Sequence, residues 1–454
     1  MERGGLRPGA MAEEKGTQDS SGVLFQERAF LVAVDTGLDA GWTAEESLGE
    51  LAALVRAAGD EVVGSVAQRR ETPHPLYYVG KGKAEELKAL KSSCPFTMLV
   101  ADDELSPRQQ RSLEELLKVK VVDRSSVILD IFAQRARTHE GRIQVELAQL
   151  EYQLPRLTRM WSHLSRLGGG FGGARRGPGE TQLEVDRRVI RERIKRTRER
   201  VEEVRQRRET AARARERGLL PTMAIVGYTN AGKSTLLNAL VGEEAATVKD
   251  MLFATLDPTT RRVRVNEGQT VIVSDTVGFI HKLPHQLVDA FHATLEEVSR
   301  ADVILEVVDT ADRHAAEHRV TVRNVLDELG AGHKPRIVVL NKMDLVRDRE
   351  VTIRGRVLGR DDRHVVRISA LTGEGLEELK AVMATVLADL WLEVDVVVPY
   401  SAGELLSKVR ERGAVRFDYR DRDVRICGRV PPTLLGDLRD AAREWERALR
   451  SAGG

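Results

Sequence analysis

Residues 227–234 carry the clearest chemical signature in this chain, the sequence GYTNAGKS. An apolar run, MAIV, comes directly before it, and an amphipathic stretch, TLLNAL, comes directly after it. The pattern G-x-x-x-x-G-K-S between a strand and a helix predicts a phosphate-binding loop, because glycines let backbone N–H groups wrap phosphates at a helix N-terminus. We expect Lys233 to reach the β- and γ-phosphates and Ser234 to ligate Mg²⁺. The residues predicted to bind nucleotide here are Gly227, Tyr228, Thr229, Asn230, Ala231, Gly232, Lys233, Ser234 and Thr235.

A second segment, VIVSDTVGF, ends a predicted buried strand at Asp275. The Asp275 carboxylate is placed to hold the metal, directly or through water, and the N–H of Gly278 to contact the γ-phosphate. The next residue is Phe279, where Ras-like GTPases carry a water-orienting glutamine. Because a phenyl ring cannot orient water, intrinsic hydrolysis should be slow and should depend on a partner, an ion or another residue. His281 and His285 could approach the phosphates, but we expect them to face solvent or a partner.

Two further segments predict recognition of guanine. RIVVLNKMDL ends a predicted strand, and the carboxylate of its Asp344 can accept from both the ring N–H and the exocyclic amine of guanine. Adenine lacks this pair of donors and would leave polar groups unpaired. VVRISALTGEGL ends another strand, where open α/β sheets bind ligands. The whole set predicts an enzyme that hydrolyses GTP to GDP and phosphate. The predicted base-binding residues are Asn341, Lys342, Asp344, Ser369, Ala370 and Leu371.

The stretch MLFATLDPTTRRVRV, residues 251–265, occupies the expected position of a switch segment. Thr255 is our candidate for the hydroxyl that closes on Mg²⁺ and the γ-phosphate. Thr259 and Thr260 are alternatives, and a threonine merely at a strand edge is another interpretation. Phe253 is also assigned to the nucleotide site. We expect Lys233, Thr255 and Gly278 to act on the reacting phosphate, and Ser234, Thr255 and Asp275 to hold the metal.

Apolar strands alternate with amphipathic helices in two parts of the chain, which predicts an α/β fold with two parallel sheets. The first part begins with expected strands at 28–35 and 61–68, with a helix at 43–59 between them. The last part reads strand, helix, two strands at 414–419 and 423–430, and helix, a small α+β unit without a chemical motif. The predicted domains are a disordered tail at 1–24, an N-terminal α/β domain at 25–138, an antiparallel helical hairpin at 139–217, a P-loop GTPase domain at 218–390 and a C-terminal α+β domain at 391–454.

Apolar residues spaced four and three apart form two heptad patterns between the two sheets. Pro155 inside the first pattern should kink or divide that helix. Two such helices joined by a loop predict an antiparallel hairpin. The first pattern is Ile143, Leu147, Leu150, Leu154, Leu157, Trp161 and Leu164, and the second is Ile190, Ile194, Thr197, Val201 and Val204.

The loop between these helices, RLGGGFGGARRGPGETQLE, is rich in glycine and carries adjacent arginines. Residues 168–173 satisfy G-x-G-x-x-G, but they follow a helical pattern, whereas a dinucleotide site follows a strand. Glycine lets the backbone approach a crowded surface, and arginine forks onto phosphates. The basic stretch 187–217 is typical of a solvated helix face or, with this loop, of a probe for structured RNA. The loop residues predicted to contact RNA are Gly170, Phe171, Gly172, Gly173, Arg175 and Arg176.

Composition restricts the remaining classes of protein. The net charge of +1 over 454 residues predicts no partner by itself, and the two cysteines, Cys94 and Cys427, offer neither a disulfide framework nor paired metal ligands. No apolar run approaches the roughly 20 residues that span a bilayer. The first residues resemble no signal peptide, and Met11 is an alternative start to Met1. We therefore expect a cytoplasmic protein without a membrane partner.

The chain resembles the HflX family of translational GTPases over roughly residues 29–390. The similar strings are YYVGKGKAEEL, QVELAQLEYQLPRL, GPGETQLEVDRR, GYTNAGKSTLLNAL, LFATLDPTTR and DTVGFIHKLPHQLVDAFHATLEE. Members of that family bind the large ribosomal subunit and split or rescue stalled ribosomes under stress. Their hairpin loop approaches ribosomal RNA (rRNA) near the peptidyl-transferase region, and the ribosome stimulates hydrolysis. The resemblance implies the same partner here, with residues 170–179 as the rRNA probe and the free protein a monomer.

Alternatives stay open at three points. Residues 80–83, GKGK, precede a predicted helix and form either an ATP site, as proposed for relatives, or a turn whose lysines face rRNA. Asn230 either helps hold a monovalent cation such as K⁺ beside the phosphates or is structural. For the whole protein, the alternative is a ribosome-assembly or RNA-remodelling factor that uses GTP only as an affinity switch. A GTPase subunit of a tRNA-modifying enzyme is disfavoured, because cysteine chemistry and a folate-type site are lacking.

Overall fold

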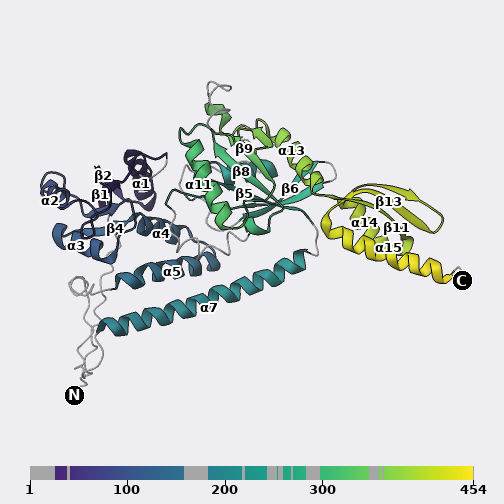
Figure 1. Cartoon of the computed structure of the whole chain (residues 1–454), viewed down its shortest axis with the longest axis horizontal. Coiled ribbons are helices and arrows are strands. Elements are labelled where there is room, and N and C mark those ends of the chain that lie inside the picture. Colours follow the sequence, from purple (N-terminus) through teal and green to yellow (C-terminus); the bar gives the residue numbers. More distant parts are fainter. Residues whose placement is uncertain are drawn as a thin grey trace, which may run out of the picture.

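The computed structural model describes residues 26–37, 41–157, 182–216, 220–242, 253, 259–266, 269–282, 297–346, 357–359 and 362–452. The molecule is elongated, with the N-terminal sheet at one end, a larger sheet in the middle and a small C-terminal unit at the other end (Figure 1). The expected α/β fold with a C-terminal α+β unit is confirmed. No helix within these ranges is long and apolar enough to cross a membrane.

The N-terminal sheet is parallel throughout, with strand order β2-β1-β3-β4. Alternate residues of β1 face opposite sides, so that Leu31 packs towards α1 and α4, while Val32 packs towards α2 and α3. Thr43 and Glu46 form a capping box that starts α1. The elements are β1 (Arg28–Asp35), α1 (Ala44–Ala58), β2 (Glu61–Arg69), α2 (Lys81–Leu90), β3 (Met98–Ala101), α3 (Pro107–Leu117), β4 (Lys120–Asp123) and α4 (Arg124–Arg135).

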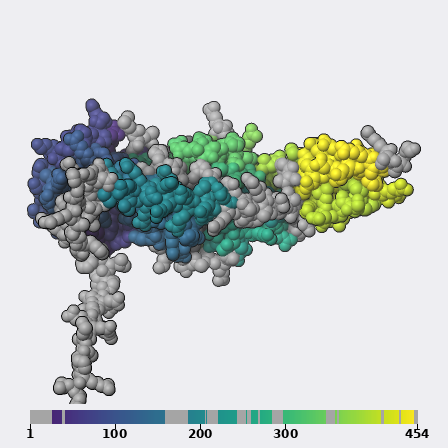
Figure 2. Space-filling view, turned by 90° about the horizontal axis from the view of Figure 1, so that it is seen from below, coloured from purple at the N-terminus to yellow at the C-terminus, as the bar shows by residue number. Residues whose placement is uncertain are grey.

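The predicted helical hairpin is present. Helix α5 (His139–Gln153) ends in a 3₁₀ turn, η1 (Leu154–Arg156), because Pro155 cannot continue the helical hydrogen bonds. Helix α7 (Gln182–Glu216) runs antiparallel beside it (Figure 1). Seen from below, α7 lies along one face of the molecule, between the N-terminal sheet and the C-terminal unit (Figure 2). The seam between the helices contains Leu147, Leu150, Leu154, Ile190, Ile194 and Val201.

The central sheet has the strand order β10-β9-β8-β5-β7-β6, with only β6 antiparallel to its neighbour. Its five parallel strands therefore end at one edge, and the predicted motifs follow them there. The elements are β5 (Thr222–Gly227), α8 (Lys233–Val241), β6 (Thr259–Asn266), β7 (Gln269–Asp275), β8 (Val303–Asp309), α11 (Ala315–Glu328), β9 (Arg336–Asn341), η2 (Met343–Leu345), β10 (His364–Arg367) and α13 (Leu376–Asp389).

The C-terminal unit is an antiparallel sheet, β11-β13-β12, covered by α15. Its core includes Val398, Ile426 and Leu438, all fully buried. Both short strands predicted at 414–419 and 423–430 are confirmed with the same bounds. The elements are β11 (Leu392–Pro399), η3 (Tyr400–Ala402), α14 (Gly403–Arg412), β12 (Ala414–Tyr419), β13 (Asp423–Val430) and α15 (Pro432–Ala452).

Candidate active site

The loop between β5 and α8 needs its two flanking glycines for space as well as for conformation. Gly227 has φ 154°, and a Cβ there would lie 2.4 Å from the carbonyl oxygen of Val307 on β8. Gly232 has φ 91°, and its Cβ would lie 2.3 Å from Nδ2 of Asn341. Side chains at these positions would both strain the backbone and push neighbouring strands away. The loop is therefore locked between β8 and the end of β9.

Lys233 lies at the start of α8, 6% exposed, with its ammonium folded back over the loop. Its Nζ donates to the carbonyl oxygens of Gly227, at 3.2 Å, and Tyr228, at 2.7 Å. Burial lowers the pKa of Lys233 to about 8, and the nearby Asp275 carboxylate only partly opposes this. A phosphate beside Nζ would restore the favoured charge, so the site is electrostatically prepared for an anion.

Ser234 and Asp275 come together as the sequence predicted. The Ser234 hydroxyl donates to Oδ2 of Asp275 at 2.6 Å, from the first turn of α8 to the last residue of β7. Asp275 is 1% exposed. A hydroxyl and a carboxylate in contact at the mouth of a phosphate loop offer the hard oxygen ligands that Mg²⁺ prefers.

The DTVGF segment pairs with the phosphate loop in the manner of a parallel strand. The N–H of Phe279 donates to the Gly227 carbonyl at 3.1 Å, and the N–H of Thr229 donates to the Phe279 carbonyl at 2.8 Å. Gly278 lies so close to the loop that a Cβ there would approach Thr229 to 2.9 Å and Nζ of Lys233 to 3.1 Å. Its backbone is thus held beside the lysine predicted to reach the terminal phosphate.

Asn341 joins three of the predicted segments. Its Nδ2 donates to the Ala231 carbonyl at 2.8 Å, and its Oδ1 accepts from the Ala370 N–H at 2.9 Å. The following residue, Lys342, has φ 61° and pairs with Asp309 at 2.8 Å. Sequence reasoning missed Asp309, although an acid at the last position of a parallel strand is a signal for such a role. Asp344 and Leu371 are exposed, as a contact with a base requires.

Some predicted residues lie outside the described part of the chain. They include Thr255 of the switch segment, His285, and the whole predicted RNA-contacting loop, Gly170 to Arg176. The alternatives to Thr255 are visible, since Thr259 and Thr260 begin β6, and the Thr260 hydroxyl lies 3.2 Å from that of Ser274. Their position in a strand agrees with the strand-edge interpretation.

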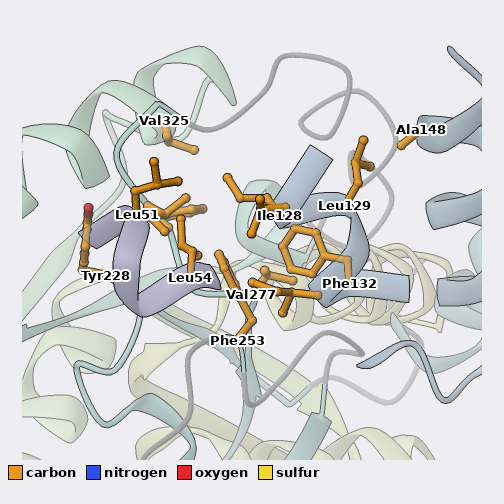
Figure 3. Close-up of a cluster of buried hydrophobic side chains, with 14 of the residues drawn as sticks. Leu51, Leu54, Ile128, Leu129, Phe132, Ala148, Tyr228, Phe253, Val277 and Val325 are labelled. Atoms are coloured by element: carbon orange, nitrogen blue, oxygen red, sulfur yellow. The ribbon is translucent and has the colours of Figure 1, made fainter. Parts of the chain in front are cut away.

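The N-terminal domain packs directly against this site, which the sequence did not predict. Figure 3 shows Leu51 and Leu54 of α1, with Phe132 of α4, gathered around G-domain residues that include Phe253 and Val277. The rings of Phe132 and Phe253 meet edge to face, with centroids 4.6 Å apart. The nucleotide-side elements and the N-terminal domain thus share one hydrophobic core.

His281 also lies at this interface, so the expectation that it faces solvent or an external partner is wrong. Its ring stacks on Trp42 of the N-terminal domain, with centroids 4.6 Å apart and an interplanar angle of 7°. Lys282, at φ 55°, pairs with Asp102 at 2.7 Å and with Asp103 at 2.5 Å. No local pattern announces these contacts, because each joins residues far apart in the chain.

Two polar groups of the glycine-lysine turn at residues 80–83 are engaged within the protein. The Gly80 N–H, at the start of α2, donates to Oε1 of Gln68 at 2.7 Å, and Lys83 pairs with Glu86. Lys81 is exposed.

Comparison with known proteins decides the family. Residues 45–133 and 135–215 match the models of the GTP-binding GTPase N-terminal and middle regions, and residues 222–342 match the 50S ribosome-binding GTPase model. A GTPase HflX of Lacrimispora saccharolytica is 46% identical over 419 residues, covering 92% of this chain and 97% of the relative. The chain belongs to the HflX family of GTPases. The GTPase HflX of Escherichia coli K12 is 43% identical over 405 residues, covering 89% of this chain and 92% of that one.

Membership in the HflX family confirms the predicted enzyme class, a P-loop GTPase that hydrolyses GTP. A GTP-binding protein from Sulfolobus solfataricus, crystallised with GDP, is 26% identical to the present HflX-family chain, with a TM-score of 0.41. The structural match includes 80% of this chain and 98% of the Sulfolobus protein.

Proposed function

We propose that this HflX-family GTPase binds the large ribosomal subunit when loaded with GTP, splits or rescues stalled ribosomes, and is released by hydrolysis. The observation that carries the proposal is the match of residues 222–342 to a family described as 50S ribosome-binding GTPases, in a chain that also bears a basic helical hairpin. The protein would accordingly be cytoplasmic and partly ribosome-associated.

Within the site, each predicted residue takes the role that its position suits. The loop from Gly227 to Thr235 would hold the phosphates through backbone N–H groups, with Lys233 neutralising their charge. The N–H of Gly278 would contact the γ-phosphate. Specificity for guanine would come from Asp344, with the backbone of 369–371 at the base edge. Asn341 supports this set by tying the two base loops to the phosphate loop.

The contact between Ser234 and Asp275 supports Mg²⁺ as the metal, with Thr255 as a third candidate ligand. Bound Mg²⁺ would neutralise negative charge that develops on the phosphates. K⁺ beside Asn230 is a further proposal, which the left-handed φ of 61° at that residue neither favours nor opposes. ATP at residues 80–83 stays a further proposal, since these residues form the N-terminus of α2, where an anion can bind.

The hairpin is anchored as a stalk needs to be. Asp123, at the end of β4, accepts from the Tyr152 hydroxyl at 2.7 Å and from Arg156 at 3.0 Å, and the Arg156 guanidinium lies 3.5 Å from the centre of the Tyr152 ring. Arg193 and Arg198 pair with acids of α5, so part of the basic charge holds the two helices together. Other exposed cations on α7, including Arg191, remain on the outer surface.

The test is co-sedimentation of the purified protein with large subunits and with assembled ribosomes, in a non-hydrolysable GTP analogue or in GDP. We expect analogue-dependent binding and separation of the assembled ribosomes into subunits. A variant with residues 170–179 replaced by a short linker should keep GTPase activity without ribosomes and lose splitting. A chain that binds large subunits in GTP but leaves assembled ribosomes intact would favour the assembly-factor alternative. Binding that ignores the nucleotide would contradict both.

A further inference from the structure

The hydroxyl of Tyr228, in the phosphate loop, reaches out of the G domain towards α1. It accepts a hydrogen bond from the His281 N–H at 2.7 Å and donates one to Oε1 of Glu50 on α1. Its ring stacks on His318, with centroids 3.6 Å apart. Burial, and then the Glu50 carboxylate, raise the pKa of Tyr228 well above its usual range, so the hydroxyl remains a donor. A phosphate-loop side chain is therefore held by an acid of another domain.

Arg124, at the start of α4, contacts both Glu50 and His281, the two partners of the Tyr228 hydroxyl. Its guanidinium is 1% exposed and binds Oε2 of Glu50 at 2.6 Å, while the same Nη1 donates to the His281 carbonyl at 3.3 Å. Burial by itself lowers the pKa of Arg124, but Asp102 and Glu50 more than offset this and raise it. Both backbone groups of His281 are thus engaged, the N–H by Tyr228 and the carbonyl by Arg124. Glu50, Tyr228, His281 and Arg124 form a closed ring of hydrogen bonds, here named the four-residue ring.

His281, one member of the four-residue ring, lies only three residues after Gly278, whose N–H is proposed to contact the γ-phosphate. Holding His281 fixes the end of the segment in which Phe279 pairs with Gly227 and Thr229. That pairing places Gly278 against Lys233. Buried ion pairs contribute little net stability once the cost of desolvating the charges is counted, so stability alone gives no reason to place these charges here. A role in orienting the Gly278 backbone would explain why these charges are buried here.

We propose that Glu50 and Arg124 of the N-terminal domain are positioning residues for GTP hydrolysis, acting through Tyr228 and His281 to hold Gly278 beside Lys233. The inference rests on the proposed contact of the Gly278 N–H with the γ-phosphate. It makes the N-terminal domain part of the machinery of the GTPase, because the ring sets the geometry of a group that meets the phosphate. Misplacing such a group by about 1 Å costs up to about a hundredfold in rate.

The test compares Glu50→Ala, Glu50→Gln and Tyr228→Phe in the full-length protein. Tyr228→Phe keeps the ring stacked on His318 and removes only the hydroxyl. Glu50→Gln keeps an acceptor for that hydroxyl. The control is Glu45→Ala, an exposed acid on the same helix. Single-turnover GTP hydrolysis, KM for GTP, affinity for GDP and the thermal midpoint with GDP bound are measured for each variant.

We expect Glu50→Ala and Tyr228→Phe each to lower the rate constant about tenfold, with KM and GDP affinity within about twofold of wild type. Glu50→Gln should recover most of the rate, and Glu45→Ala should match wild type. The double variant Glu50→Ala/Tyr228→Phe should be no slower than the worse single variant, because both break one ring.

Three outcomes would overturn the inference. The first is an unchanged rate in Glu50→Ala. The second is a faster rate, which would mean that the four-residue ring inhibits hydrolysis. The third is a parallel loss of rate, GDP affinity and thermal midpoint, which would mean that the ring has only a structural role. A Gly278→Ala arm separates the two levels of the argument. Wild-type rate in Gly278→Ala would contradict the proposed site itself, whereas a slow Gly278→Ala beside an unchanged Glu50→Ala contradicts only the inference.

Discussion

The two parallel sheets of this chain both present polar side chains at their carboxyl edges, yet the edges serve different partners. The edge of the central sheet carries glycines at 227 and 232, a helix N-terminus and a lysine whose charge burial disfavours. The edge of the N-terminal sheet carries Asp102 and Asp123, and both are saturated by buried arginines. The first edge is prepared for an anion, while the second is closed internally and binds protein.

The difference lies in how each edge neutralises its charge. At the N-terminal edge, burial alone would raise the pKa of Asp102, but Arg124 and Lys282 lower it to about 2. Lys282 belongs to the G domain, so this acid is completed only when the two domains are packed together. At the central edge Lys233 has backbone carbonyls as its hydrogen-bond acceptors, and it gains most from a phosphate. Substitutions should therefore act mainly on ligand binding at the central edge and mainly on stability at the N-terminal edge.

The largest effect should come from Lys233→Ala. Removing the cation proposed to contact the β- and γ-phosphates should lower the rate of GTP hydrolysis by about 10³-fold or more. The free energy of unfolding without nucleotide should change by less than about 1 kcal/mol, because burial already penalises the charged lysine. Single-turnover hydrolysis and urea unfolding measure the two quantities. Lys380→Ala, which removes an ion pair with the exposed Glu377 on α13, is the control, and a hydrolysing Lys233→Ala protein would contradict the assigned role.

Arg124→Met should, in contrast, lower the free energy of unfolding strongly, in addition to any effect on the hydrolysis rate. The substitution leaves Glu50 and Asp102 without their cationic partner. Leaving buried charges unpaired costs about 3 kcal/mol of unfolding free energy. Urea unfolding measures the loss. Arg193→Ala is the matched control, since its ion pair with Glu146 is exposed and should contribute less than about 0.5 kcal/mol. If both variants lost the same unfolding free energy, the buried charges of the N-terminal edge would contribute no more than an exposed ion pair, which would contradict the comparison.

The smallest effect is a dependence on pH. Since the pKa of Lys233 is about 8 in the free protein and bound phosphate favours the charged form, nucleotide binding takes up a proton above pH 8. Affinity for GDP should therefore be constant from pH 6.5 to 7.5 and fall above pH 8, by up to about tenfold per pH unit. Fluorescence titration of a labelled GDP measures it, and affinity that rises between pH 8 and 9 would contradict the assignment.

The N-terminal edge should be insensitive over the same pH range. The pKa of Asp102 is depressed on folding, so its contribution to stability is present above the pKa of the unfolded chain and is lost only as the pH falls through about 2. The unfolding free energy should therefore not change between pH 5 and pH 7 on account of this acid, whose contribution is fully present at both.

Much of the fold was readable from local pattern. Alternating apolar strands and capped helices predicted both parallel sheets, and the bounds of β1, β12 and β13 agree with prediction. The phosphate loop was equally readable, because its chemistry needs particular residues at fixed spacing between a strand and a helix. The end of α5 just before Pro155 followed from the missing N–H of proline.

The partners of isolated charged and aromatic residues were not readable in this way. Glu50 is one acid among several on α1, and Arg124 simply follows a strand. His281 was misassigned to solvent or an external partner because nothing near it in the sequence points to Trp42. The polar residues that follow β3 and β4 could have indicated a functional surface there, since functional groups gather at the carboxyl edges of parallel sheets.

The sequence by itself determined that this chain holds a phosphate loop, a guanine-recognition motif and two parallel sheets, because backbone geometry, glycine and hydrophobic period act over short distances. Only the tertiary structure decided that the edge of one sheet packs against the predicted nucleotide site of the other. Lys282 finds Asp102 across 180 positions, and Tyr228 finds Glu50 across 178. Packing of whole domains creates such pairs, and no local pattern encodes which charge will be buried against which.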